Sequence, residues 1–249
     1  MVKVKILGIA ASPRHGNTEI MVKEALRGAQ ELADVEAEFI SLTGMKISPC
    51  DADYKCFHEK NPKKPCVSIT DDLDEVLLKM MEADGIIVGT PTYWAGVTAQ
   101  LKMLIDRSMA LEACDYALRN KVGGALTCAV GRNLGLETCL VDIHNWFIQQ
   151  DMIVVSVGPE RVSGSAAGAT AIQMVGNVDM KLGRTPKEAL SAVLKDVGGI
   201  KSCRNLGRRV TEVAKAIKLG FSQLPENEHY YPIKGYKLDY EETYGMKNP

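Results

Sequence analysis

An apolar segment that runs directly into a short polar loop and then into a helical pattern constrains the fold of this chain most. Residues 4–10 are largely apolar without clean alternation, which is typical of a parallel strand buried on both faces. The loop SPRHGNT follows at 12–18, and from Thr18 to about Leu32 the apolar residues recur at helical spacing. A strand, a polar loop and a helix in this order predict an α/β fold.

The loop itself has the chemistry of a phosphate site. The start of a helix offers unpaired backbone N–H groups and the positive end of the helix dipole to an anion. Four side chains of the loop suit the oxygens of a phosphate monoester, namely Ser12, Arg14, Asn17 and Thr18. Neither the Walker pattern nor the dinucleotide G-x-G-x-x-G pattern is present. An ordinary strand-to-helix turn with a capped helix is the alternative interpretation.

A second unit of the same kind spans 85–107. A mostly apolar strand over 85–90 ends in the loop PTYWAG at 91–96, and a helix with Leu101, Leu104 and Ile105 on one side follows. Ligands of open α/β sheets bind outside the carboxyl ends of the strands, where the winding reverses. Tyr93 and Trp94 would offer aromatic surface to a planar ring there, unless they only cover the core.

The remaining periodicities complete a doubly wound parallel sheet of five strands in the order 2-1-3-4-5, with right-handed crossovers. Further strands are expected at 36–42, 122–130 and 152–157, and helices at 71–82, 134–150, 186–192 and 205–219. Residues 158–183 are rich in Gly, Ser and Ala and are expected to form a long loop with a short helix.

Three segments together resemble the family of NADPH-dependent FMN reductases and iron–sulfur flavoproteins. They are SPRHGNT at 12–18, GTPTYWAGVTAQLKMLIDR at 89–107 and VGGALTCAVGRNLGLETCL at 122–140, in an order and spacing that match over residues 3–218. The resemblance implies a flavodoxin-like fold that binds FMN noncovalently, with the phosphate at the four residues of the first loop. It places the ring and ribityl chain at Pro91, Thr92, Tyr93, Trp94 and Ala95. It places the pyrimidine edge beside Gly131, Arg132, Asn133 and Gly135.

Three cysteines between the second strand and the next helix raise the question of a metal. Iron–sulfur members of the resembled family carry C-x2-C-x2-C and a fourth cysteine here; this chain has Cys50, Cys56 and Cys66, with Asp53 in the second position. Clusters normally take four thiolates, so a carboxylate would leave a more labile iron. The alternatives are a zinc ion held by Cys3Asp or, through His58, Cys3His, and a surface loop with no metal.

Composition narrows the functional class. A net charge of −1 over 249 residues argues against a nucleic-acid-binding surface. No apolar run has the length of a membrane span and no signal peptide precedes the first strand, so we expect a cytoplasmic protein without a membrane partner. Seven cysteines without regular spacing argue against a disulfide framework.

The C-terminal segment differs from the rest of the chain. We expect a flavodoxin-like domain over 1–220 and an arm over 221–249, which holds three prolines and five tyrosines without a long apolar period. Aromatic residues at this density suit an interface, so we expect the arm to pack on a neighbouring subunit; a disordered tail is the alternative. The family resemblance implies a homodimer or homotetramer.

The expected activity follows from the cofactor. No acid–base machinery stands out in the sequence, and flavin chemistry requires none, because the cofactor itself carries the hydride or the electrons. We expect an FMN-dependent oxidoreductase that passes reducing equivalents from NAD(P)H or a protein donor to a small acceptor such as a quinone or a flavin. The alternative is a non-enzymatic electron carrier with a redox protein partner, in which an iron–sulfur cluster accompanies FMN.

Overall fold

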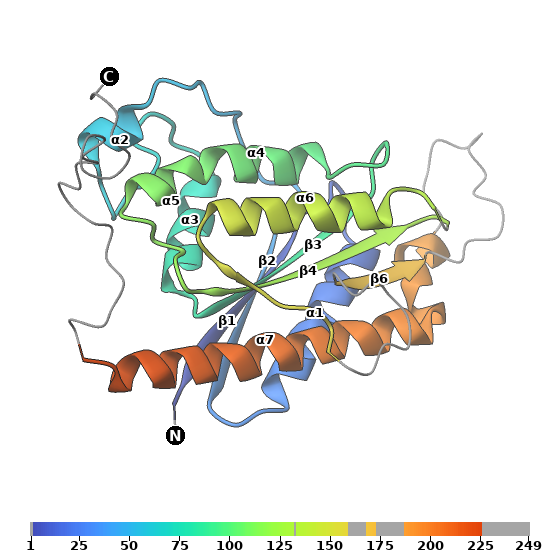
Figure 1. Cartoon of the computed structure of the whole chain (residues 1–249). Coiled ribbons are helices and arrows are strands. Elements are labelled where there is room, and N and C mark those ends of the chain that lie inside the picture. Colours follow the sequence, from blue (N-terminus) through green and yellow to red (C-terminus); the bar gives the residue numbers. More distant parts are fainter. Residues whose placement is uncertain (1, 132, 159–167, 173–186, 226–249) are drawn as a thin grey trace, which may run out of the picture.

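The computed structural model describes residues 2–131, 133–158, 168–172 and 187–225. A parallel sheet with the order β2-β1-β3-β4-β5 forms its centre, and β6 also pairs with β4 (Figure 1). The strands are β1 (Val4–Ala10), β2 (Val35–Ser41), β3 (Gly85–Pro91), β4 (Val122–Ala129), β5 (Ile153–Val154) and β6 (Ala169–Ile172). The helices are α1 (Asn17–Gln30), α2 (Lys55–Glu59), α3 (Leu73–Glu82), α4 (Ala99–Arg107), α5 (Met109–Ala113), α6 (Leu136–Gln149) and α7 (Val197–Gln223), with a 3-10 helix, η2 (Lys187–Lys195).

The sheet is buried between two layers of helices (Figure 1). Successive residues of a strand point to opposite faces, so Ile86 of β3 packs in the core beneath α3, α4 and α6, whereas Ile87 packs in the core with α1 and α7. Both isoleucines are fully buried. Burial on both faces explains why the central strands are continuously apolar in the sequence.

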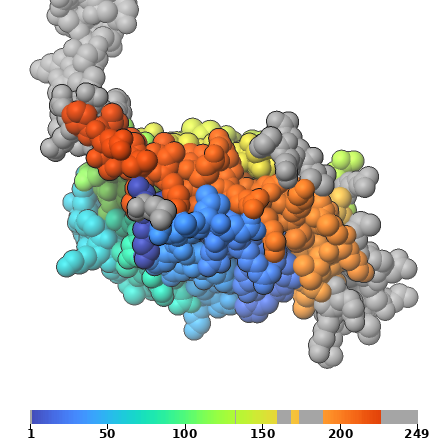
Figure 2. All heavy atoms as spheres, turned by 90° about the horizontal axis from the view of Figure 1, so that it is seen from below, coloured from blue at the N-terminus to red at the C-terminus, as the bar shows by residue number. Residues whose placement is uncertain are grey.

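Helices α1 and α7 lie against each other on one face, where Figure 2 shows the orange-to-red helix alongside the blue one. Two glycines permit this approach. A Cβ on Gly28 of α1 would lie closer than 3.0 Å to the carbonyl oxygen of Arg204, and one on Gly207 of α7 equally close to that of Ala25. The two helix backbones are therefore in direct contact, and side chains larger than hydrogen are excluded at both positions.

The predicted strand order is confirmed, and the first four strands begin and end within about two residues of their predicted bounds. The fifth position differs. β5 has only two residues and pairs with the start of β4, while β6 pairs with the end of β4 from within the stretch predicted as a loop. β6 is made of small residues, and it packs against Gly199, where a Cβ would lie 2.7 Å from the carbonyl oxygen of Thr170.

The C-terminal part of the chain departs from its predicted boundaries. α7 starts at Val197 rather than at residue 205 and continues to Gln223, beyond the predicted end of the domain at residue 220. The segment predicted as helical over 186–192 is a 3-10 helix from Lys187 to Lys195. Most of the predicted C-terminal arm, residues 226–249, lies outside the described residues. No helix within the described ranges combines the length and the apolar character needed to cross a membrane.

Candidate functional site

The loops that follow β1, β3 and β4 meet at one edge of the sheet. The backbone N–H of Ala11 donates to the carbonyl of Gly89 at 2.7 Å, and that of Thr92 to the carbonyl of Cys128 at 2.8 Å. The hydroxyl of Thr98 donates to the carbonyl of Ala11 at 2.7 Å. A cavity of about 270 Å³ lies between these loops, lined by Arg14, Pro91, Thr92, Tyr93, Trp94, Cys128, Ala129 and Val130. Five of these residues belong to the site expected from the sequence.

The start of α1 is prepared for an anion. Gly16 occupies the N-cap position without a side-chain cap, so the first turn carries no capping hydroxyl or carboxylate. The hydroxyl of Ser12 accepts from the N–H of Arg14 at 3.1 Å and donates to its carbonyl at 2.8 Å, which fixes the turn of the loop. The hydroxyl of Thr18 lies 3.6 Å from the sulfur of Cys128, at the base of the cavity.

Asn17 has a structural role that the sequence did not predict. Its Nδ2 donates to the carbonyl of Ala189 at 2.6 Å, and its Oδ1 accepts from the N–H of Val193 at 3.0 Å. Both heteroatoms of this buried amide are therefore bonded to η2. The side chain fastens η2 to the start of α1, because both of its polar groups pair with backbone there; that it also binds phosphate through its second N–H stays a prediction.

Glu19 brings a negative charge into the same first turn. Burial would raise the pKa of its carboxyl, but hydrogen bonds from Ser41 and His15 lower it below the ordinary value. The Ser41 hydroxyl donates to Oε1 at 2.6 Å, Nδ1 of His15 lies 2.7 Å from the same oxygen, and the ammonium of Lys23 lies 3.8 Å from Oε2. The carboxylate is thus ionised and surrounded by donors, which offsets its repulsion of a second anion.

Trp94 stands at the tip of a tight turn beside the cavity. The backbone of Tyr93 and Gly96 exchanges two hydrogen bonds, at 2.9 and 3.0 Å, and Trp94 and Ala95 between them have φ values of 50° and 62°. Positive φ at both central positions defines a type I′ turn, which is costly for a bulky residue. The Trp94 side chain is fully exposed. The turn therefore holds a large aromatic surface in solvent at the mouth of the cavity.

The loop after β4 supports this turn. Gly135 has a φ of 82°, and a Cβ there would lie closer than 3.0 Å to the backbone of Ala95. Ala95 thus packs on the neighbouring loop. Neither Ala95 nor Gly131 is among the described residues that line the cavity, and Arg132 lies outside the described residues. Cys128, Ala129 and Val130 were not expected; their position at the carboxyl end of a predicted central strand is the signal that would have found them.

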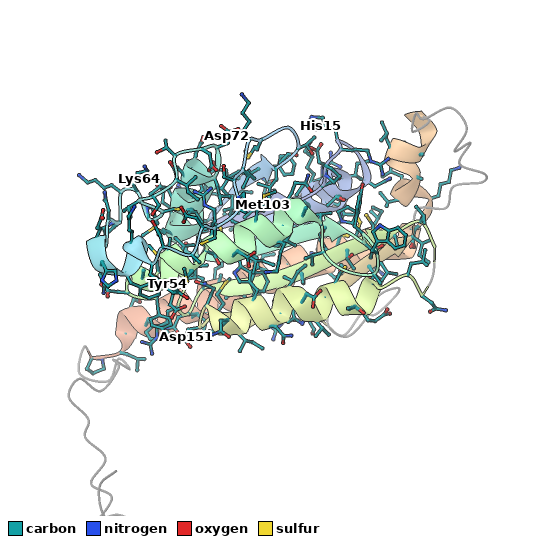
Figure 3. All side chains as sticks on the ribbon, turned by 90° about the horizontal axis from the view of Figure 1, so that it is seen from above. His15, Tyr54, Lys64, Asp72, Met103 and Asp151 are labelled. Carbon is teal, nitrogen blue, oxygen red and sulfur yellow. The ribbon has the colours of Figure 1, made fainter. Side chains whose placement is uncertain are left out.

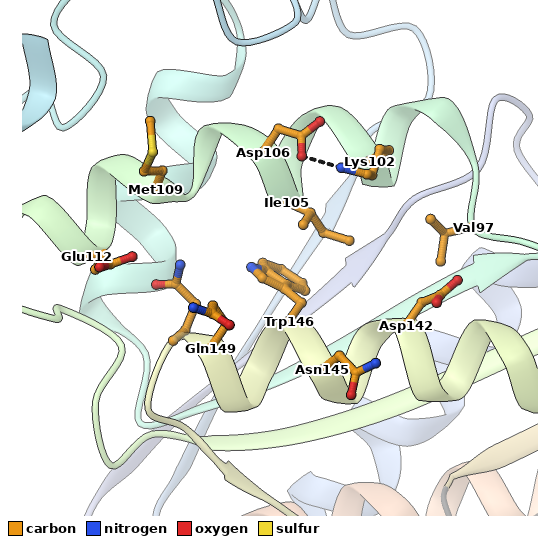
Figure 4. A pocket seen from close by; sticks show the side chains of 11 residues that line it. Val97, Lys102, Ile105, Asp106, Met109, Glu112, Asp142, Asn145, Trp146 and Gln149 are labelled. Carbon is orange, nitrogen blue, oxygen red and sulfur yellow. Dashed lines mark hydrogen bonds and ion pairs between the residues drawn. The ribbon is translucent and has the colours of Figure 1, made fainter. Parts of the chain in front are cut away.

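A larger cavity of about 550 Å³ lies elsewhere, between α4 and α6 (Figure 4). Trp146 lies at its centre, and Lys102 pairs with Asp106 at its rim. Glu112 and Asp142 add further carboxylates, so the lining carries more acidic than basic groups. Repulsion of a phosphate by these carboxylates favours the smaller cavity at the sheet edge as the cofactor site.

The three cysteines of the loop after β2 gather around a third, small cavity. Cys50, Cys56 and Cys66 line it together with Asp53, Ser68 and Arg107, and it encloses about 20 Å³. Cys56 and Cys66 are buried, and burial together with the nearby Cys66 and Cys50 raises the pKa of the Cys56 thiol. Within the described residues, no three His, Cys, Asp or Glu side chains are arranged to hold a single metal ion, so this arrangement does not support the zinc alternative.

Arg107 is the least expected residue of this cavity. It is 1% exposed, and its Nη1 donates to Asp71 at 2.6 Å, while Nε and Nη2 have no hydrogen-bond partner. Nη2 lies 3.7 Å from Asp74. Burial lowers the pKa of the guanidinium, but the hydrogen bonds to Asp71 and Cys66 raise it overall, so Arg107 ties the cysteine loop to the start of α3.

Comparison with known proteins gives the family. Residues 4–173 match the model of the NADPH-dependent FMN reductase family. The chain belongs to this family. It is 42% identical over 216 residues to an iron–sulfur flavoprotein of Methanocaldococcus jannaschii, covering 86% of this chain and all of that protein. It is 27% identical to an NAD(P)H dehydrogenase (quinone) of Methanosarcina barkeri, over 87% of this chain and 99% of that one.

The solved structures agree on the fold. A flavodoxin, WrbA-like protein from Agrobacterium tumefaciens superposes with a TM-score of 0.57 at 18% identity, covering 86% of this chain and 99% of that one. The fold is thus flavodoxin-like, as expected from the sequence. Membership of the FMN reductase family makes the protein an FMN oxidoreductase in the general sense.

Proposed function

We propose that this protein binds FMN at the sheet-edge cavity and passes reducing equivalents from NAD(P)H, or from a protein donor, to a small acceptor such as a quinone or a flavin. The observation that carries the proposal is one cavity lined both by Arg14, from the loop before an uncapped helix start, and by the turn that exposes Trp94. Relatives named NAD(P)H dehydrogenase (quinone) support the donor and the acceptor class.

Different residues would contact the phosphate and the ring of FMN. The uncapped N–H groups at the start of α1 and the guanidinium of Arg14 would hold the phosphate, as the dipole of the helix favours an anion there. Pro91, Thr92 and Tyr93 would line the ring, and Trp94 would cover it and exclude water. FMN supplies the hydride and electron chemistry when bound, and the protein supplies position and a dry surface.

The phosphate assignment is tested by Arg14→Ala. Loss of a charge-assisted contact costs about 1.5–3 kcal/mol, which weakens FMN binding about 10- to 150-fold. Fluorescence titration of the apoprotein with FMN measures this, with Arg209→Ala as the matched control, because Arg209 lies on α7 and pairs with Glu212. Unchanged affinity in Arg14→Ala, or FAD in the flavin extracted from the native protein, would refute the assignment.

The second candidate function is a flavoprotein electron carrier that also holds an iron–sulfur cluster. The buried guanidinium of Arg107 among three thiols favours it, and so do the names of the iron–sulfur flavoprotein relatives. Steady-state oxidation of NADH or NADPH with a quinone separates the two: rapid turnover supports the reductase, and its absence with reversible one-electron reduction supports the carrier.

We also propose a cytoplasmic homodimer or homotetramer, in which the residues after α7 reach a neighbouring subunit. The aromatic content of residues 221–249 supports this assembly.

A further inference from the structure

The larger cavity, between α4 and α6, has no part in the proposed flavin function. It shares no lining residue with the cavity at the sheet edge. We propose that it binds a linear aliphatic polyamine, which is a chain of methylene groups with an ammonium group at each end. The two ammonium groups pair with Glu112 and Asp142, and the methylene groups between them lie against Trp146.

The cavity follows two helices that lie side by side. α4 and α6 come after two paired parallel strands, β3 and β4, so they run in the same direction across the sheet. Figure 3 shows this pair from above, with α4 marked by Met103 and the end of α6 marked by Asp151. Asp142 lies in the first half of α6, and Glu112 lies on α5, past the end of α4. The two carboxylates therefore belong to opposite ends of the cavity, with Trp146 between them (Figure 4).

The charges of the lining suit a ligand with two separate positive groups. Lys102 pairs with Asp106, which leaves Glu112 and Asp142 as lining carboxylates without an ion pair to any described residue. Glu112 accepts one hydrogen bond, from the Tyr116 hydroxyl at 3.3 Å. In the part of the chain that the structure describes, no three His, Cys, Asp or Glu side chains converge on one point, so the lining does not match a compact metal ion. An extended cation matches it, because each carboxylate attracts one positive group.

Gln150 is an independent sign that a hydrogen-bond donor belongs in this cavity. It lines the cavity and is only 3% exposed. Its Nε2 donates to the carbonyl and to the hydroxyl of Ser108, both at 3.2 Å. Because a carbonyl only accepts, the amide nitrogen must face Ser108, and Oε1 lies on the other side. Oε1 has no hydrogen-bond partner. A buried acceptor without a partner is costly, and an N–H group of a bound amine would satisfy it.

Ser108 also fixes the indole that lies between the two carboxylates. Nε1 of Trp146 donates to the Ser108 hydroxyl at 2.8 Å, and this hydroxyl donates to the carbonyl of Ile105 at 2.7 Å. The ring is thus held in one orientation at the centre of the cavity (Figure 4). An ammonium group is attracted to the face of an indole, and methylene groups pack against it. Val97 and Met109 extend the apolar lining on either side of the ring.

The length of the cavity selects the length of the ligand. Asp142 and Gln149 lie seven residues apart on α6, which is about 10 Å along its axis. Gln149 lies at the same end of the cavity as Glu112 (Figure 4). The volume of about 550 Å³ is ordinary for a small-molecule site. Spermidine or hexane-1,6-diamine can reach from one carboxylate to the other, whereas a shorter amine reaches only one of them. An anion would be repelled, and an uncharged apolar molecule would leave both carboxylates unpaired.

The experiment is calorimetric titration of the full-length protein at low ionic strength with spermidine, hexane-1,6-diamine and hexylamine. Hexylamine has the methylene chain of the diamine but one ammonium group, so wild type should bind the diamine about fivefold more tightly, as expected for one partly exposed ion pair. Asp142→Asn and Glu112→Gln should each weaken diamine binding about fivefold and change hexylamine binding much less. Glu75→Gln removes an exposed carboxylate of α3 outside the lining and is the matched control; its affinities should equal those of wild type.

A further variant tests the position of the ligand. Asn145 is exposed and lines the cavity, so Asn145→Arg brings a cation into the lining without disturbing the core. This variant should lose measurable binding of the diamine, because the guanidinium competes for the carboxylates and repels the ligand. FMN content should stay unchanged, since the two cavities share no lining residue. The melting temperature of each variant reports whether it is folded.

Three outcomes overturn the proposal. Wild type that binds none of the three amines removes the site and leaves the proposed flavin function standing. Equal affinity for the diamine in wild type, Asp142→Asn and Glu112→Gln shows only general attraction to an acidic surface. No amine binding in wild type, with fewer chains per particle in Asn145→Arg by light scattering, makes this face an interface between copies of the chain. Selective binding of the diamine to a protein that contains no FMN would uphold the site and refute the proposed flavin function alone.

Discussion

Replacement of Asn17 by alanine separates a structural from a ligand-binding role at the start of α1. The amide makes two buried hydrogen bonds to η2, to Ala189 and Val193. Alanine leaves a buried carbonyl and a buried N–H without partners, at about 1–3 kcal/mol for each group. We expect a loss of about 2–4 kcal/mol, since η2 can move and rehydrate one of the two. For a chain of this size that corresponds to a fall of roughly 4–16 °C in melting temperature.

The measurement is thermal unfolding of the apoprotein by circular dichroism, because no flavin is then present to contribute. Ser12→Ala is the matched control: the Ser12 hydroxyl bonds only to the backbone of Arg14 in its own loop, and the hydrogen bond from Thr43 to the Ser12 carbonyl is kept, so its apoprotein should melt within about 2–4 °C of wild type. Flavin affinity is measured separately on both variants. An Asn17→Ala apoprotein with wild-type stability but much weaker FMN binding would restore the ligand role that the sequence suggested and refute the structural one.

Three further predictions test other parts of the molecule. In a Trp146→Phe variant, FMN should quench the remaining fluorescence of Trp94, which is fully exposed at the cavity mouth; constant emission would exclude Trp94 from the site. Deletion of residues 224–249 should lower the number of chains per particle, measured by light scattering, and an unchanged number of chains would refute the proposed arm on a neighbouring subunit. Burial would raise the pKa of Asp71, but the hydrogen bond from Arg107 lowers it overall. The ionised form therefore stabilises the protein above the unfolded pKa of about 3.9, and this contribution is lost as the pH falls through the lower folded value; the unfolding free energy of Asp71→Asn should depend less on pH in that range.

The sequence predicted the elements whose burial is uniform. β1, β3 and β4 are covered on both faces, so their continuous apolar runs mark them almost to the residue. β6 was not predicted, because its mostly small residues do not form a continuous run of large apolar side chains. The start of α7 was not predicted, because the glycines at 198 and 199 interrupt the helical pattern. Gly199 is needed for contact with β6, and such a contact cannot be read from one segment alone.

In the candidate site, too, the sequence did not predict contacts between distant segments of the chain. Loops at the carboxyl ends of strands follow from topology, so the sequence brought Arg14, Tyr93 and Trp94 to one cavity, as the structure shows. The direction of the Asn17 amide depends on Ala189, which is 172 residues away. The burial of Arg107 depends on the loop that packs over the end of α4. From the sequence alone, a charged residue at the end of a helix is expected to be exposed to solvent.

The glycine contact between α1 and α7 links the position of the start of α1 to packing near its other end. Gly28 lies eleven residues from Asn17, about 16 Å along the axis. A methyl group at Gly28 or Gly207 would wedge that end of the pair apart and tilt the other end, which carries the phosphate loop. We therefore expect either substitution to weaken the proposed binding of the FMN phosphate from the other end of α1, without any change to a residue that lines the cavity. For protein engineering, substitutions at these two positions would change cofactor affinity from outside the cofactor site.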